Sequence, residues 1–202
     1  MKITPLNIWM TNCYLIETEK TAIIIDPAFK RQKLVDFLKE NEHKERLVLI
    51  THGHFDHIGG AVNLREETGV KIGIGALDNP ALSDDDLNCA ASFNRSLTPF
   101  DADYLYNDGD IVKVGDIELK VIATPGHTVG GVSYTTENLV FTGDTLFKVS
   151  VGRTDFAGGD FSVLEKSIKK LYTLPDETVV YPGHGESTTI GFEKQNNPFV
   201  RL

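Results

Sequence analysis

Short apolar runs separated by polar residues open the chain and predict a meander of β-strands. The runs cover residues 2–10, 13–18 and 22–26, with two or three polar residues between successive runs. Residues 29–43 then carry leucine, valine and phenylalanine at helical spacing. The opening segment is therefore predicted to form three strands followed by one helix.

A strand, a loop and a second helix are predicted next. Residues 46–51 are a continuous apolar strand pattern, the polar run "HGHFDH" follows, and a helical pattern resumes between residues 58 and 68 once Gly59 and Gly60 are passed. This order is typical of an α/β protein.

The pattern weakens between residues 76 and 100. The "SDDD" run at 83–86 predicts the start of a helix, and Pro80 and Pro99 are predicted breaks. We expect this segment to be an insertion close to the functional site.

Strands return in the second half and helices follow them. The repeat of this order suggests a sandwich of sheets covered by helices. The expected elements are strands at 111–114, 117–124, 131–136 and 139–143, with turns at 108–109 and 137–138, a helix at 160–174, a strand and loop at 178–185, and a polar tail at 189–202 with a short helix ended by Pro198.

Composition narrows the classes of function. Lys and Arg total 20 against 29 Asp and Glu, a net charge of -9, which argues against a phosphate-binding surface and a nucleic-acid partner. The N-terminus lacks an apolar signal core, and no segment reaches the ~18 apolar residues of a membrane helix, so we expect a cytoplasmic protein without membrane contact. Two cysteines are too few for a disulfide framework, and Cys13 and Cys89 are expected to be free, buried thiols.

The densest chemistry lies in "THGHFDH" at 51–57. In an extended segment, residues two apart point the same way, so His52 and His54 can bind one ion from one side. Asp56 and His57 follow where the chain turns into a helix and can reach a second, adjacent ion. Imidazole and carboxylate ligands suit zinc, manganese or iron.

Three more candidate ligands follow strands elsewhere in the chain. His127 and His184 each come after a Pro-Gly turn, and Asp144 comes after a glycine at a strand end. A single such residue is usually a cap or turn residue, and His43, at the polar end of a helix, is expected to be solvated. The joint pattern predicts a metal site made of His52, His54, Asp56, His57, His127, Asp144 and His184.

These motifs together resemble the ligand-bearing motifs of the metallo-β-lactamase superfamily. The resemblance implies an αββα sandwich, with two mixed sheets face to face and helices on both outer faces. It also implies roles for the candidate ligands: His52, His54 and His127 for a first metal, Asp56, His57 and His184 for a second, and Asp144 as the bridging carboxylate. Asp26 in "IIIDP" would orient a ligand histidine, and Asp56 would also orient the attacking hydroxide.

Within that superfamily, "LFKVSVGRTDFAGGD" and "TTIGFEKQNNPFVR" resemble the glyoxalase II group, the hydroxyacylglutathione hydrolases of short bacterial type. The resemblance implies a single domain over residues 1–202 without the helical C-terminal extension of the long enzymes. It implies two divalent ions, zinc first with iron or manganese as alternatives, whose shared hydroxide attacks a small thioester such as S-lactoylglutathione. Arg153 and Asp155 stand where that group has lysine and tyrosine, so Arg153 is a candidate substrate-binding residue and a loop ion pair is the alternative.

Other functions fit parts of the same pattern. A lactonase or another hydrolase of the fold would use the same ligands. "GRTDF" also resembles persulfide dioxygenases, which hold a single iron, and a metal-binding protein without turnover would keep the ligands alone. A β-lactamase is expected less, because such enzymes normally carry an export signal.

Overall fold

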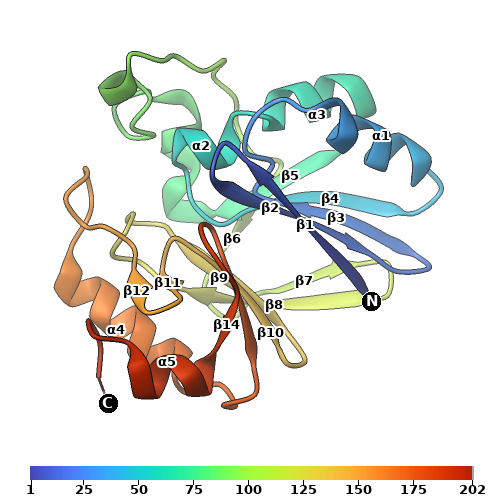
Figure 1. Ribbon diagram of the computed structural model, residues 1–202. Coiled ribbons are helices and arrows are strands. Elements are labelled where there is room, and N and C mark those ends of the chain that lie inside the picture. The colour runs from blue at the N-terminus through green and yellow to red at the C-terminus, as the bar shows by residue number, and fades with distance from the viewer. Residues whose placement is uncertain (202) are drawn as a thin grey trace.

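The computed structural model describes residues 1–201 and shows two sheets packed face to face, with helices on both outer faces (Figure 1). The αββα arrangement expected from the sequence is confirmed. Each sheet has six strands, and each mixes parallel and antiparallel pairs.

The first sheet follows the order of the chain. Its first three strands pair antiparallel, and the remaining pairs are parallel. The strands are β1 (Lys2–Ile8), β2 (Thr11–Glu17), β3 (Thr21–Ile25), β4 (Glu45–Ile50), β5 (Lys71–Gly75) and β6 (Tyr104–Tyr106).

The second sheet is antiparallel except where β10 (Leu139–Gly143) pairs with β13 (Val179–Pro182). A small hairpin of β11 (Leu146–Phe147) and β12 (Ser150–Val151) stands beside it. The order across the sheet is β14 (Thr188–Thr189), β13 (Val179–Pro182), β10 (Leu139–Gly143), β9 (Val132–Thr136), β8 (Ile117–Ala123) and β7 (Ile111–Val114).

Helices cover the outer face of each sheet (Figure 1). The longest one begins where the sequence predicts, because the Asp160 carboxylate accepts hydrogen bonds from the backbone N–H groups of Ser162 and Val163. No helix between residues 1 and 201 is long and apolar enough to cross a bilayer. The helices are α1 (Gln32–Glu40), α2 (Phe55–Ile58) and α3 (Ala61–Thr68) on the first sheet, and α4 (Phe161–Leu171) and α5 (Ile190–Asn196) on the second.

The central strands are buried on both faces. In β3, Ile23 and Ile25 enter the core between the sheets, whereas Ile24 packs in the core beneath α1 and α3. The two sheets are also joined by a polar bond, because the buried Tyr134 hydroxyl of β9 donates to the carbonyl of Ile50 at the end of β4. This bond lies one residue before the histidine motif and fixes the end of β4 against the second sheet.

Two local expectations were wrong. The strand predicted over 2–10 ends at Ile8, and Trp9 and Met10 form the turn into β2. No helix starts at 83; the segment instead forms short 3-10 turns at Ala76–Ser83 and Ala91–Phe93. Strands β5 and β6 were not predicted from the sequence. Cys13 and Cys89 are free and buried, as expected.

Candidate metal centre

The seven predicted ligands gather at one edge of the sandwich, although they come from four separate segments of the chain. His52 and His54 follow β4, and Asp56 and His57 lie in the short helix α2. The other three lie in loops that follow strands of the second sheet: His127 after β8, Asp144 after β10 and His184 after β13. His43, by contrast, is exposed and lies outside the cluster.

Within this cluster, the ligand atoms form overlapping sets suited to metal ions. His52, His54 and His127 form one set, and Asp56, His57 and His184 form another, with all ligand atoms in each set within 4.8 Å of one another. A third set, His52, His57 and Asp144, overlaps both and satisfies the same limit.

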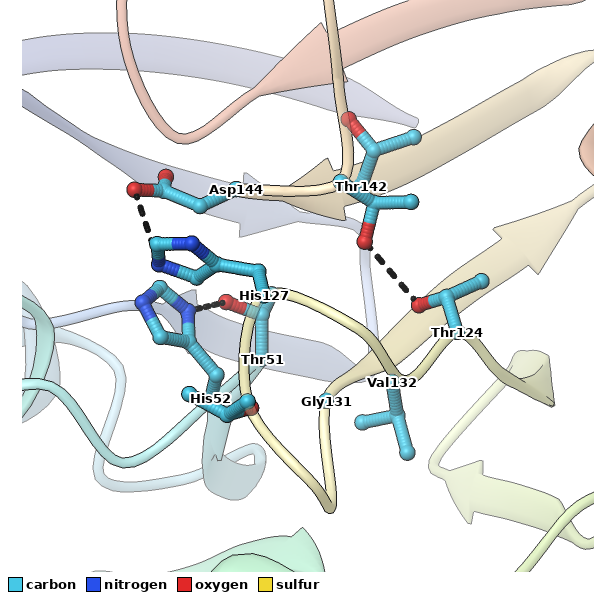
Figure 2. Close-up of a pocket in the computed structure, with 10 residues that line it drawn as sticks. Thr51, His52, Thr124, His127, Gly131, Val132, Thr142 and Asp144 are labelled. Carbon is cyan, nitrogen blue, oxygen red and sulfur yellow. Dashed lines mark hydrogen bonds and ion pairs between the residues drawn. The ribbon is translucent and has the colours of Figure 1, made fainter. Parts of the chain in front are cut away.

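Asp144 stands between the two histidine groups. Its Oδ2 lies 3.5 Å from Nε2 of His127 and 3.3 Å from Nε2 of His184, and its Oδ1 lies 3.4 Å from Nε2 of His57. Figure 2 shows the Asp144 carboxylate facing the His127 ring. A carboxylate in this place can contact ions on both sides.

The buried ring nitrogens of the cluster lack hydrogen-bond partners. The Nε2 atoms of His52, His54, His57 and His127 are buried without a partner, and so is Oδ1 of Asp144. Burying unpaired polar atoms costs ~1–3 kcal/mol each, so native proteins seldom leave several together. The donor set, nitrogen and carboxylate oxygen, matches zinc, iron or manganese and fits a pair of cations.

Hydrogen bonds hold the other ring nitrogen, Nδ1, of His52, His57, His127 and His184. Nδ1 of His57 lies 2.9 Å from Oδ2 of Asp26, and Nδ1 of His52 lies 3.1 Å from the Thr51 hydroxyl (Figure 2), which itself donates to Asp26. The other two rings donate to main-chain carbonyls: His127 to Arg153 at 2.6 Å and His184 to Met10 at 2.8 Å. Each bond directs the Nδ1–H at its acceptor and turns Nε2 toward the centre, where it can bind a cation.

Burial and the two carboxylates act in opposite directions on the histidine pKa values in the cluster. Although burial opposes it, the Asp144 and Asp56 carboxylates raise the pKa of His184 to about 10. Burial likewise raises the pKa of Asp144, but His57 and His184 outweigh it and hold that pKa well below its ordinary value. At His54 burial dominates and, with His127 nearby, lowers the pKa to about 3, so this ring is neutral and ready to ligate.

Asp78, which the sequence analysis missed, joins the two loops that supply the first histidine set. Its Oδ2 accepts from the N–H of Gly53 at 2.9 Å and from the Thr128 hydroxyl at 2.7 Å, and its Oδ1 accepts from the N–H of Gly130 at 2.7 Å. Gly53 stands between His52 and His54, and Thr128 follows His127. The carboxylate is buried and fixes these loops in register. No sequence signal marked it, because its partners lie 25 to 52 residues away.

A small polar pocket of about 10 Å³ lies behind the centre, about the space that one water needs. Threonine hydroxyls from both sheets line it, including Thr51 and Thr124 (Figure 2). The Thr124 hydroxyl is hydrogen-bonded to Ser133 and Thr145, each at 3.1 Å. This network braces the ends of β8 and β10, after which His127 and Asp144 follow.

A larger cleft of about 610 Å³ opens over the cluster, and His54, Asp56, His127, Asp144 and His184 form its floor. Its walls are mostly apolar and aromatic, as is usual for sites that bind small molecules. Arg153 lines the cleft, and both of its hydrogen bonds go to the Asp155 carboxylate, at 2.6 Å from Nε and 2.6 Å from the terminal nitrogen. Its guanidinium also stacks on Phe156, with 3.9 Å between Cζ and the ring centroid.

A fold of this kind with a histidine and carboxylate cluster at the sheet edge defines a class of metal-dependent hydrolases. The sequence profile of the metallo-β-lactamase superfamily matches residues 6–184, and the chain belongs to this superfamily.

Relatives of similar length extend the comparison. The chain is 36% identical over 206 residues to the hydroxyacylglutathione hydrolase GloC of Haemophilus influenzae, covering 99% of this chain and 97% of that one. Among solved structures, the BLEG-1 B3 metallo-β-lactamase has a TM-score of 0.89 and 38% identity, with 98% of each chain covered. TTHA1623, crystallised in a di-iron-bound form, has a TM-score of 0.85 and 33% identity, with 99% of this chain and 100% of that chain covered.

Proposed function

We propose that the protein is a dinuclear metallohydrolase that cleaves thioesters, with glutathione thioesters such as S-lactoylglutathione as the leading substrates. The observation that carries this proposal is the cluster of unpaired ring nitrogens and carboxylates on the floor of an apolar cleft of about 610 Å³. The similarity to GloC supports the choice of substrate.

Two divalent cations held at this centre would lower the pKa of a water molecule and polarise a carbonyl group. We assign His52, His54 and His127 to one ion, Asp56, His57 and His184 to the other, and Asp144 to both. Zinc is the expected metal. Iron is the alternative, because TTHA1623 was crystallised with two irons.

Asp56 has a second task in this proposal. The Thr11 hydroxyl donates to its Oδ2 at 2.9 Å and fixes the carboxylate. Oδ1 then serves as the acceptor that orients the attacking water. Asp26 keeps the His57 ring, and through Thr51 the His52 ring, in the orientation that ligation requires.

The cleft favours a leaving group that departs without a proton. Between residues 1 and 201, no lysine or tyrosine lines it, and its only carboxylates are the ligands Asp56 and Asp144. A thiolate, with a conjugate pKa of ~8.5, leaves unprotonated, whereas an amine needs a donor. This supports a thioester over an amide.

The leading test is hydrolysis of S-D-lactoylglutathione by protein of measured metal content, with dissolved oxygen followed in the same cuvette. We expect saturable hydrolysis with kcat/KM above ~10⁴ M⁻¹s⁻¹ and no oxygen consumption. Turnover below ~10² M⁻¹s⁻¹ with both metals bound, or oxygen consumption, would refute the proposal.

β-Lactam hydrolysis is the second candidate, favoured by the 38% identity to the BLEG-1 B3 metallo-β-lactamase over 98% of both chains. A penicillin and a cephalosporin belong in the same assay. A kcat/KM for either that exceeds the value for the thioester would reverse the order of the two functions.

A further inference from the structure

The rim of the cleft holds an arginine that is not paired with any carboxylate. Between residues 1 and 201, no carboxylate oxygen lies within 4.0 Å of the Arg95 guanidinium, and the guanidinium donates no hydrogen bond to another residue. Its Cζ lies 4.7 Å from the ring centroid of Trp9 and 5.5 Å from that of Phe29. Stacking occupies the face of the guanidinium and leaves its in-plane N–H donors available to a planar anion.

Trp9 is held at this rim by an unusual turn. Trp9 and Met10 both have left-handed backbones, with φ of 55° and 74°, which glycine or asparagine would adopt more easily. The turn is fixed because the Met10 carbonyl accepts the His184 hydrogen bond and the Met10 N–H donates to Asn7. Trp9 nevertheless remains 62% exposed. A strained turn that presents a large aromatic side chain beside a cleft is typical of a binding surface.

The charges around the cleft limit what this surface can bind. Arg95 and Arg153 are the lysine or arginine side chains that line the cleft in the described chain, and Asp155 already neutralises Arg153. One unpaired positive charge, in a chain of net charge -9, suits one carboxylate. A thiol carrier with several phosphate groups would meet repulsion instead.

We propose that Arg95 and Trp9 form a subsite for a carboxylate of the substrate, so that the enzyme selects thioesters of carboxylated thiols over those of phosphorylated carriers. This inference rests on the thioester hydrolysis proposed above. The guanidinium binds the carboxylate through two parallel N–H donors, and the indole ring covers the adjoining apolar part of the substrate.

Trp9 supplies a readout that needs no turnover, because it is the single tryptophan of the chain. S-hexylglutathione, a thioether that cannot be hydrolysed, is titrated against metal-loaded protein while Trp9 emission is followed. Its dimethyl ester, which lacks the carboxylates, is the matched ligand. Lys113→Gln removes one exposed positive charge outside the cleft and is the matched variant.

We expect the wild type and Lys113→Gln to bind S-hexylglutathione with the same Kd, and Arg95→Gln to bind it at least about tenfold more weakly. Arg95→Lys, which keeps the charge but loses the fork geometry, should fall between them. The dimethyl ester should bind all four proteins alike. An equal Kd for wild type and Arg95→Gln, or an equal loss for both ligands, would overturn the subsite.

Kinetics then separate this inference from the proposed reaction. If S-D-lactoylglutathione is hydrolysed, Arg95→Gln should raise KM about tenfold or more and change kcat less than about twofold. Hydrolysis with an unchanged KM would refute the subsite and leave the reaction standing. The expected Kd pattern without hydrolysis of any thioester would refute the reaction and leave the subsite standing.

Discussion

Asp26 accepts a hydrogen bond from His57, with 2.9 Å between Oδ2 of Asp26 and Nδ1 of His57. The same oxygen accepts from the Thr51 hydroxyl at 2.7 Å, and Oδ1 accepts from the Thr51 N–H at 2.8 Å. Asp26 also has a left-handed backbone, with φ of 50°. The residue is thus held in a conformation that aspartate seldom adopts, and all three side-chain hydrogen bonds described here go to Thr51 or His57 of the histidine motif.

Asp26→Asn should weaken metal binding by ~10–100-fold, because an amide NH₂ in place of one oxygen faces a donor and the His57 ring loses its anchor. The measurement is metal per chain after dialysis against a competing chelator. Asp36→Asn makes the same change at an exposed site on α1 and should retain metal as the wild type does. Equal metal retention in both variants would show that Asp26 does not orient His57 for metal binding.

Asp78→Ala should lower stability by ~3 kcal/mol, because it leaves the buried N–H groups of Gly53 and Gly130 without acceptors. For a chain of this length, that loss lowers Tm by ~6–12 °C. Asp84→Ala is the control, since Asp84 also accepts two N–H bonds but is exposed, so water can replace it. Thermal unfolding of the metal-free proteins measures both, and similar Tm values for the two variants would contradict the account.

The two glycines around His184 should differ sharply when changed to alanine. A Cβ at Gly183 would overlap the Asp144 carboxylate and lie 2.8 Å from Cε1 of His57, so Gly183→Ala should displace both ligands and abolish metal binding. A Cβ at Gly185 would meet no atom within 4 Å, and its φ of 77° predicts a cost of only ~1–2 kcal/mol. Metal analysis of the two purified variants decides the point, and a Gly183→Ala protein with full metal content would show that the cluster can shift.

Asp144→Ala should lose both metal and activity, since its carboxylate contacts both histidine groups. In the wild type at metal concentrations ~1,000 times Kd, chelation should remove ~4 kcal/mol of stability, or ~8–16 °C in Tm. In Asp144→Ala, chelation should shift Tm by less than half as much. Unchanged metal content with normal turnover would refute the bridging assignment.

Substitutions of Arg153 and of Asp155 should change KM in opposite directions. Arg153→Gln should raise KM for S-D-lactoylglutathione less than about threefold, because Asp155 already occupies the guanidinium. Asp155→Asn removes that competitor, frees Arg153 for substrate binding and should lower KM. Steady-state kinetics test both, and a raised KM in Asp155→Asn would show that the pair itself shapes the cleft.

The ligand cluster could be predicted because its signals are local. Each segment that carries ligands follows an apolar run that predicts a strand, and the ends of neighbouring strands meet at one edge of a sheet. Residues 52, 54, 56 and 57 also lie close together in sequence, so their geometry follows from the chain alone.

Strand β5 was not predicted because it contains two glycines, which its tertiary contacts require. Gly73 and Gly75 weaken a strand pattern, yet a Cβ at Gly73 would overlap the Tyr106 ring and one at Gly75 would overlap the Gly130 carbonyl. The helix predicted to start in the acidic run at 83–86 is absent for a related reason. Asp84 accepts from the N–H groups of Asp86 and Leu87 and Asp85 from that of Leu97, so side chains that resemble a helix start hold a turn.

The hydrogen bonds from His127 and His184 end on main-chain carbonyls, and this affects how the substrate specificity of the cleft can change by mutation. Met10 and Arg153 anchor these rings through their carbonyl oxygens, and every amino acid has one. Both side chains, however, line the cleft. Mutation at positions 10 and 153 can therefore diversify the cleft while the rings keep their orientation, which lets one reactive centre be inherited unchanged across enzymes with different substrates.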